Sequence, residues 1–168
     1  MSAGKRFSLE AARRTREMRS NLPVFSPKNR PIFSESSPHM LMWDDLLTQF
    51  GNDEQRRKIV NMLDWHIDNL KRHGIIVDAL LVGGSFVIPD LCPSDIDALL
   101  FYRIAPKCNV KRAIDFLRTP TPREIDLRYA PQDADVSILV KMISFFTLLY
   151  SYNVNTERIS SPIFIIQI

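Results

Sequence analysis

Hydrophobic residues recur along this chain with two periods, one typical of helices and one typical of strands. The clearest helical repeat lies between residues 53 and 73, where apolar side chains stand three or four positions apart. Its members are Ile59, Leu63, Ile67 and Leu70. Asn52 or Asp53 can cap the first turn and Gly74 can end the last, so the pattern predicts a long helix with one buried face.

Four further segments have the composition of helices. They span residues 9–20, 40–50, 110–118 and 136–150. Asn109 and Asp135 can cap the third and the fourth of them, because their side chains can accept a hydrogen bond from the first turn. The last segment is apolar on all sides, and we therefore expect it to lie buried under a sheet.

Strands are predicted between these helices. They cover residues 75–82, 95–102, 124–129 and 162–168. The third has the alternation of a half-buried strand, with Ile125 and Leu127 against Asp126 and Arg128. The order of helices and strands predicts an α/β (α+β) fold, in which helices pack on a small mixed sheet.

The chain has 168 residues, enough for one domain with its own core. We place this single domain at residues 21–168. Four prolines and several apolar residues in 21–38 favour an extended segment that lies on the domain. Residues 1–20 precede it as a basic N-terminal helix or arm.

The positive charge is concentrated at the N-terminus. Residues 1–30 hold eight Lys or Arg and two acids, a net charge of +6, whereas the whole chain carries +3. Such an arm can contact nucleic acid, nucleotide phosphates or an acidic partner. It has almost no aromatic side chains for stacking on bases, and we favour the interpretation that its charges only keep the chain soluble.

The cysteines and the hydropathy of the chain indicate the cellular compartment of the protein. Cys92 and Cys108 have neither metal-ligand nor redox spacing, which is typical of free thiols in a reducing environment. No apolar segment follows the basic N-terminus, as a signal peptide would require. The most apolar run, 136–150, contains Lys141 and is shorter than the ~20 residues of a membrane span. We expect a cytoplasmic protein without a membrane partner.

A glycine-rich turn followed by two carboxylates is the most informative motif. Gly83, Gly84 and Ser85 follow the first predicted strand, and Asp95 and Asp97 open the next. Alternate side chains of a strand share a face, so the two carboxylates point the same way and repel each other unless a cation lies between them. Backbone N–H groups of the turn can bind phosphate oxygens. Together these parts indicate a site for a magnesium-bound nucleotide.

This motif resembles the signature of the polymerase-beta-type nucleotidyltransferase superfamily. Val82-Gly83-Gly84-Ser85 and Asp95-Ile96-Asp97-Ala98 fit that signature with nine residues between them. Ile125-Asp126-Leu127 fits the place of a third carboxylate on a later strand. Over about residues 22–150 the chain also resembles small bacterial nucleotidyltransferase-like proteins, the minimal nucleotidyltransferases, and this likeness implies a nucleotidyltransferase-like domain.

The resemblance implies an enzyme that uses two metal ions to move a nucleoside monophosphate from a nucleoside triphosphate, such as ATP, to a hydroxyl. Asp95 and Asp97 would hold both Mg²⁺ (or Mn²⁺) ions, while Asp126 would hold one of them and take the proton of the hydroxyl. The turn at 83–85 would bind the triphosphate. The acceptor would be a protein or an RNA, and similar proteins of this size often belong to toxin–antitoxin or phage-defence systems.

Three basic residues are candidate phosphate ligands. They are Arg103, Arg128 and Lys141. A lysine in an apolar helix needs a reason, and contact with the nucleotide or a side chain that reaches solvent would each supply one. Asp126 also has competitors for the role of third carboxylate, although one stands on a helix and two fit a turn and a cap better. These competitors are Asp115, Asp133 and Asp135.

Two other functions fit the sequence. The fold could bind a nucleotide or a partner protein as a regulator without turnover, and the strand at 164–168 could pair with a strand of that partner. Alternatively, the basic arm could bind RNA, with a steep dependence on salt. The position of Asp126 separates an enzyme from a regulator, because catalysis requires it to face Asp95 and Asp97.

Overall fold

The structure is a computed structural model, and it describes residues 38–51, 53–153, 158–159 and 161–168. The helix expected at 9–20, the basic arm and the extended segment up to residue 37 lie outside the described residues.

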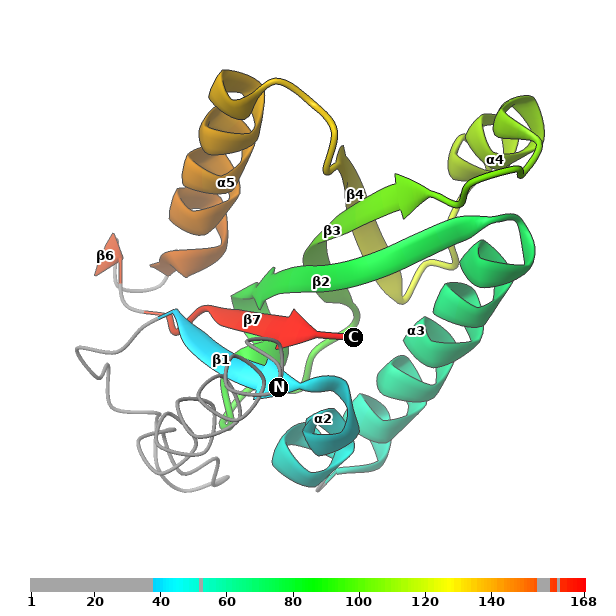
Figure 1. Ribbon diagram of the computed structural model, residues 1–168. Helices are drawn as coiled ribbons and strands as arrows, with labels where there is room; N and C mark the ends of the chain where they lie inside the picture. The colour runs from blue at the N-terminus through cyan, green and yellow to red at the C-terminus, as the bar shows by residue number, and fades with distance from the viewer. Residues whose placement is uncertain (1–37, 52, 154–157, 160) are drawn as a thin grey trace, which may run out of the picture.

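Five strands form one mixed sheet in the order β1-β7-β2-β3-β4 (Figure 1). The strands are β1 (His39–Met42), β2 (Ile75–Gly83), β3 (Ile96–Ile104), β4 (Ile125–Pro131) and β7 (Phe164–Gln167). β2 runs antiparallel to both of its neighbours, whereas the pairs β1–β7 and β3–β4 are parallel. A separate pair of short strands consists of β5 (Tyr152–Asn153) and β6 (Arg158–Ile159). The α+β fold with a small mixed sheet is confirmed.

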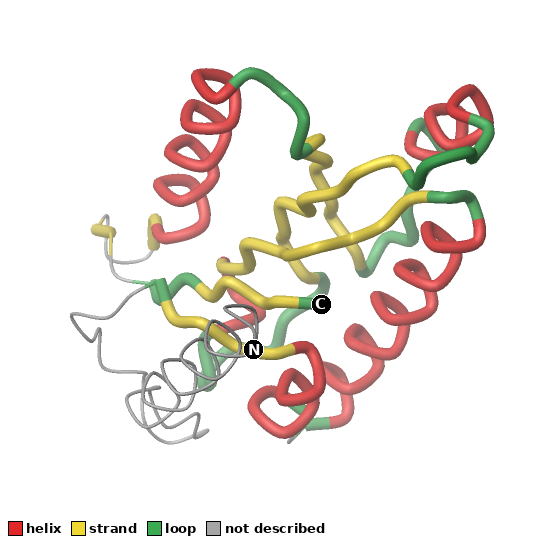
Figure 2. Tube along the Cα trace, viewed as in Figure 1, coloured by secondary structure: helices red, strands yellow, loops and turns green. Residues whose placement is uncertain are grey.

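Within the described residues, four α-helices and one short 3₁₀-helix accompany the sheet (Figure 2). They are α2 (Trp43–Phe50), α3 (Glu54–Arg72), η1 (Gly84–Val87), α4 (Val110–Leu117) and α5 (Val136–Ser151). The predicted caps are confirmed, because Asp53, Asn109 and Asp135 each accept a hydrogen bond from a backbone N–H in the first turn of α3, α4 and α5. The local sequence therefore sets where these helices begin.

The helix predicted at 40–50 begins later than expected. Residues 39–42 form β1, which pairs in parallel with β7 from the far end of the chain. Helix α2 follows directly at Trp43. The prediction was wrong for residues 40–42, because the pairing that decides their conformation is with residues 164–167, more than a hundred positions away.

The sheet separates two unequal cores. The larger core lies on the side of α2 and α3, where the apolar face of α3, including Leu63, packs on Leu80, Leu100 and Phe164. The smaller core lies on the side of α5 and contains Leu81, Leu99, Ala130, Tyr150 and Ile163. Figure 1 shows α3 and α5 on different sides of the strands.

The expectation that the 136–150 helix is buried was wrong. Only Tyr150 and Ser151 of α5 are buried, and Leu139, Met142 and Phe146 are half-buried against the smaller core. A helix that touches a sheet on one side covers only that side, so the rest of this apolar helix faces outward. In the described part of the chain, no helix is long and apolar enough to span a bilayer.

Candidate functional site

Asp97 lies in the middle of a row of three residues on three neighbouring strands. Its register partner on β2 is Gly83, and its register partner on β4 is Asp126. Adjacent strands are about 4.8 Å apart and paired residues share a face, so the two carboxyl groups are close together. This face is the one that α5 partly covers, because Leu99 and Tyr150 belong to the smaller core. The structure thus brings Asp97 and Asp126 together at the glycine end of β2.

The two glycines lie beside this row for different reasons. Gly84 has a φ of +68°, and a Cβ on it would come within 2.5 Å of Asp97 Oδ2. Gly83 is buried, and a Cβ there would come within 2.6 Å of the Cβ of Tyr150 and 2.7 Å of Ile163 Cδ1. Glycine is thus required at Gly84 by the backbone conformation and the carboxylate, and at Gly83 by the packing of α5.

Gly84 and Ser85 are half-exposed, unlike Gly83. Both stand at the start of η1, which follows β2 immediately. Their backbone and the Ser85 hydroxyl are therefore accessible to a ligand next to the Asp97 carboxylate. Of the three residues expected to bind nucleotide at this turn, these two present groups at the surface, whereas Gly83 makes room for the helix.

The electrostatics of the row centre on Asp97. The pKa of its carboxyl is raised to about 6, chiefly by burial and then by the neighbouring charges of Asp95 and Asp126, against the opposing effect of Arg128. Among the described residues, no hydrogen bond or ion pair to the Asp97 carboxylate is present. A half-buried carboxylate surrounded by two others is an electrostatic cost that a bound cation would relieve.

Asp95 stands just before β3, in the loop that follows η1. Its Oδ1 accepts a hydrogen bond of 3.0 Å from Ser94 Oγ, and its side chain is half-exposed. After burial, the charge of Asp95 is the next largest cause that raises the pKa of the Asp97 carboxyl. The Asp95 side chain therefore lies near Asp97, but Asp95 is not paired with a residue of β2 or β4.

One of the three predicted cationic side chains is beside the carboxylates. Arg128 Nη2 lies 3.4 Å from Asp126 Oδ1, and the Arg128 side chain is 60% exposed. It stands two residues after Asp126 on β4 and on the same face. Because it is exposed, it can turn from Asp126 toward an incoming anion.

The other two cations lie elsewhere. Arg103 is six residues beyond Asp97 on β3, about 20 Å along the strand, and its Nε lies 3.1 Å from Asp78 Oδ2. Lys141 is exposed on α5 and precedes Tyr150 by nine residues, which is roughly 13 Å along the helix axis. The structure does not bring either of them to the row of carboxylates.

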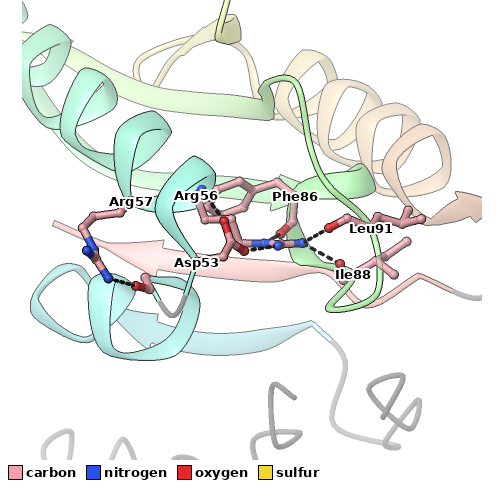
Figure 3. A network of polar contacts seen from close by, with 7 residues as sticks. Asp53, Arg56, Arg57, Phe86, Ile88 and Leu91 are labelled. Carbon is pink, nitrogen blue, oxygen red and sulfur yellow. Dashed lines mark hydrogen bonds and ion pairs between the residues drawn. The ribbon is translucent and has the colours of Figure 1, made fainter. Parts of the chain in front are cut away.

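A buried arginine holds the loop that follows the glycine turn. The Arg56 side chain is 2% exposed and lies at the start of α3 (Figure 3). Its guanidinium donates to three backbone oxygens, with distances between 2.6 and 2.9 Å. The acceptors are the carbonyl groups of Phe86, Ile88 and Leu91. It also forms an ion pair with Asp53, the residue that caps α3.

Arg56 thereby ties residues 86–91 to the first turn of α3. These residues connect the glycine turn to Asp95, so the arginine fixes the spacing between the two halves of the motif. Sequence reasoning missed it. The available signal was its position three residues before Ile59 on the apolar face of the helix, where a charged side chain must be paired.

The row of carboxylates offers oxygen donors to a divalent cation. In the described part of the chain, no group of three or more His, Cys, Asp or Glu side chains is placed to hold a metal ion. Asp97 and Asp126 remain as a pair of hard oxygen donors on one face. Mg²⁺ is usually bound by one or two carboxylates, with water and substrate phosphates as its other ligands. The residues present fit that kind of site, one that the substrate helps to complete.

Comparisons with known proteins give a family but no activity. Searches of the curated proteins and of the solved structures returned no match. A family model, described as a family of unknown function (DUF6932), matches residues 17–156, a range that includes the glycine turn and all three aspartates. Since the match covers most of its length, the chain belongs to the DUF6932 family.

Proposed function

We propose that the chain is a metal-dependent nucleotidyltransferase, which moves a nucleoside monophosphate from a nucleoside triphosphate to a hydroxyl of a protein or an RNA. One observation carries this proposal: Asp97 and Asp126 are register partners on parallel strands, with the Cα of Gly84 against the Asp97 carboxylate. The likeness to polymerase-beta-type enzymes, noted from the motifs, supports the same activity. A cytoplasmic location and a role in toxin–antitoxin or phage-defence systems stay predictions.

The proposed reaction is a substitution at the α-phosphorus. The acceptor oxygen forms a bond to this phosphorus, the bond to the β-phosphate oxygen breaks, and pyrophosphate leaves. A Mg²⁺ ion bound by Asp97 and Asp126 would supply positive charge to the phosphates. Asp126 accepts the proton of the acceptor hydroxyl.

Other residues would bind and orient the triphosphate. Gly84 presents backbone without a side chain, and Ser85 offers both its N–H and its hydroxyl as donors. Arg128 would exchange its ion pair with Asp126 for a phosphate oxygen. Asp95 adds negative charge beside Asp97 and so strengthens the attraction for a second cation carried by the nucleotide.

Incubation with each α-labelled nucleoside triphosphate and Mg²⁺, in the presence of total RNA or cell lysate, tests the activity. We expect transfer of label with the wild type and none with Asp97→Ala. Asp115→Ala is the matched control, since this exposed carboxylate stands on α4, outside the row. Protease or nuclease sensitivity of the product then identifies the acceptor. Equal transfer by wild type and Asp97→Ala would contradict the proposal.

A regulator that binds a nucleotide or a partner without turnover is the second candidate. Two observations favour it: the three aspartates do not form a complete metal cage within the described residues, and Arg128 occupies one oxygen of Asp126. Binding of Mg²⁺ and nucleotide in calorimetry, with no label transfer to any acceptor, is the result this function predicts.

A further inference from the structure

Strand β4 is an edge of the sheet, and among the described residues it pairs only with β3. The bonds at its two ends fix which of its residues face β3. The carbonyl oxygen of Glu124 accepts from the Ile96 N–H at 3.0 Å, and the Gln132 N–H donates to the Tyr102 carbonyl at 2.8 Å. Because the backbone groups of a strand alternate between its two sides, the even-numbered residues of β4 bond to β3. The odd-numbered residues point to the outer side.

Both ends of this outer side are closed by the chain itself. The Ile125 N–H donates to the Pro122 carbonyl at 3.0 Å, and its carbonyl oxygen accepts a bond of 2.8 Å from the Thr121 hydroxyl. At the other end, Pro131 has no N–H, and its carbonyl oxygen accepts from the Ala134 N–H at 3.2 Å. Neither end has a backbone group left over for another chain.

Leu127 and Tyr129 lie between these closed ends. Within the part of the chain that the structure describes, their backbone N–H and carbonyl groups have no hydrogen-bond partner. Backbone donors and acceptors of a sheet need partners, and an added strand supplies them at the matching spacing. RNA offers phosphates, hydroxyls and base edges, which do not repeat in this way. The outer side of β4 therefore fits an extended peptide better than RNA.

The row of carboxylates extends toward this open edge. Asp126 lies on β4 opposite Asp97 of β3, and its side chain is 46% exposed. A residue of an added strand that stands opposite Asp126 shares its face of the sheet, with the two Cβ atoms about 4.5–5.5 Å apart. A Ser or Thr hydroxyl at that position lies within reach of the Asp126 carboxylate, whereas the longer Tyr side chain carries its hydroxyl past it.

We propose that the acceptor is a protein, which adds an extended segment to the outer edge of β4 and places a Ser or Thr hydroxyl opposite Asp126. This inference rests on the proposed function and selects the acceptor for it. The hydroxyl oxygen forms the bond to the α-phosphorus, its proton passes to Asp126, and the bond to the leaving pyrophosphate breaks. Backbone pairing with Leu127 and Tyr129 holds the segment in register.

Amide exchange of the free full-length chain, followed by NMR, tests whether the edge is open. The amides of Leu127 and Tyr129 should exchange about tenfold or more faster than those of Arg128 and Ala130, which bond to β3. Slow exchange at both outer amides would mean that residues 1–37 or a second copy already covers the edge, and it would overturn the proposal. This result does not depend on nucleotidyl transfer.

The class of acceptor is tested by label transfer from α-labelled nucleoside triphosphates to cell lysate and to total RNA. Mass spectrometry of the labelled product should locate the modification on Ser or Thr of a protein. Transfer to RNA alone, or to Tyr, would overturn this inference and leave the proposed function standing. Absence of transfer to any acceptor would overturn the proposed function, and the inference with it.

Seven-residue peptides centred on the modified residue test the strand pairing itself. One peptide carries backbone N-methyl groups on the residues one position before and after the hydroxyl residue, and the other carries them two positions before and after. Only alternate N–H groups of an added strand face β4, so one peptide should lose about tenfold or more in kcat/KM and the other should match the unmethylated peptide. Equal values for the two methylated peptides would overturn the proposal.

Discussion

Asp97 on β3 lies directly opposite Asp126 on β4, in a parallel register that keeps both carboxylates on one face of the sheet. Parallel strands bring together residues that are 29 positions apart in the sequence, and the same row continues to Gly83 on β2. Burial, together with the charges of Asp95 and Asp126, raises the pKa of Asp97 above its ordinary value.

Replacing Asp97 by Asn should stabilise the fold at neutral pH. Because its folded-state pKa is about 6 against an ordinary 3.8, the folded protein holds a proton between these values that the unfolded chain releases. Stability therefore falls as pH rises from about 4 to 6, and the penalty persists above 6. We expect Asp97→Asn to gain about 1–2 kcal/mol at pH 7.5, since solvent screens part of the shift.

Urea unfolding of wild type and Asp97→Asn at pH 4 and pH 7.5 measures this difference. The gain should be small at the lower pH, where the Asp97 carboxyl of the folded protein is largely protonated and so carries little charge. A gain that is equal at both pH values would show that the raised pKa is not its cause.

Mg²⁺ should raise the melting temperature of the wild type and leave that of Asp97→Asn unchanged. A ligand that binds only the folded state stabilises it in proportion to the logarithm of its concentration. Differential scanning fluorimetry over a Mg²⁺ series, with K⁺ at matched ionic strength as the control, gives the readout. An equal rise in both proteins would mean that the ion binds outside the row.

Gly84→Ala should destabilise the fold by about 1–3 kcal/mol, because the φ of +68° strains any other residue. Its Cβ would also displace the Asp97 carboxylate, so Mg²⁺ binding should be lost with it. Ser85→Ala is the comparison: it should keep the stability and weaken nucleotide binding. Denaturant unfolding and calorimetry separate the two effects, and full Mg²⁺ binding by Gly84→Ala would contradict the geometry.

Arg56→Met should cost about 3–5 kcal/mol of stability, because Asp53 and three carbonyl groups lose their buried partner. Faster amide exchange should follow in residues 86–91. Arg57→Met is the matched control, since this neighbouring side chain is exposed and donates only to the Gly51 carbonyl among the described residues. Hydrogen exchange with mass spectrometry of both variants measures the amide protection of residues 86–91. Unchanged protection of 86–91 in Arg56→Met would refute the role.

Local signals were sufficient for most of the helices and strands, although not for β1. The repeat from Ile59 to Leu70 and the cap at Asp53 define α3, and Asp135 marks the start of α5. Asp97 could be singled out because a carboxylate inside an apolar strand needs a partner. Its pairing with Asp126 followed from the likeness of the motifs and not from the spacing itself.

The pairing of strands far apart in the chain and the exposure of helix α5 could not be predicted from the sequence. The strand at His39–Met42 exists because β7 pairs with it, and no local pattern reports that contact. The apolar helix α5 was expected to be buried, but the sheet covers only one side of it. Arg103 has a partner at the far end of β3, in Asp78 across the strand pair, and this could not be read from its distance to Asp97 along the chain.

The position of β7 between β1 and β2 has a consequence for synthesis on the ribosome. Among the described strands, β1 pairs only with β7. β1 is therefore synthesised well before the strand with which it pairs. Until residues 164–167 leave the exit tunnel, one edge of β2 and the whole of β1 lack their backbone partners. The hairpin of β2 and β3 can form early, but the sheet closes only after translation has passed that point.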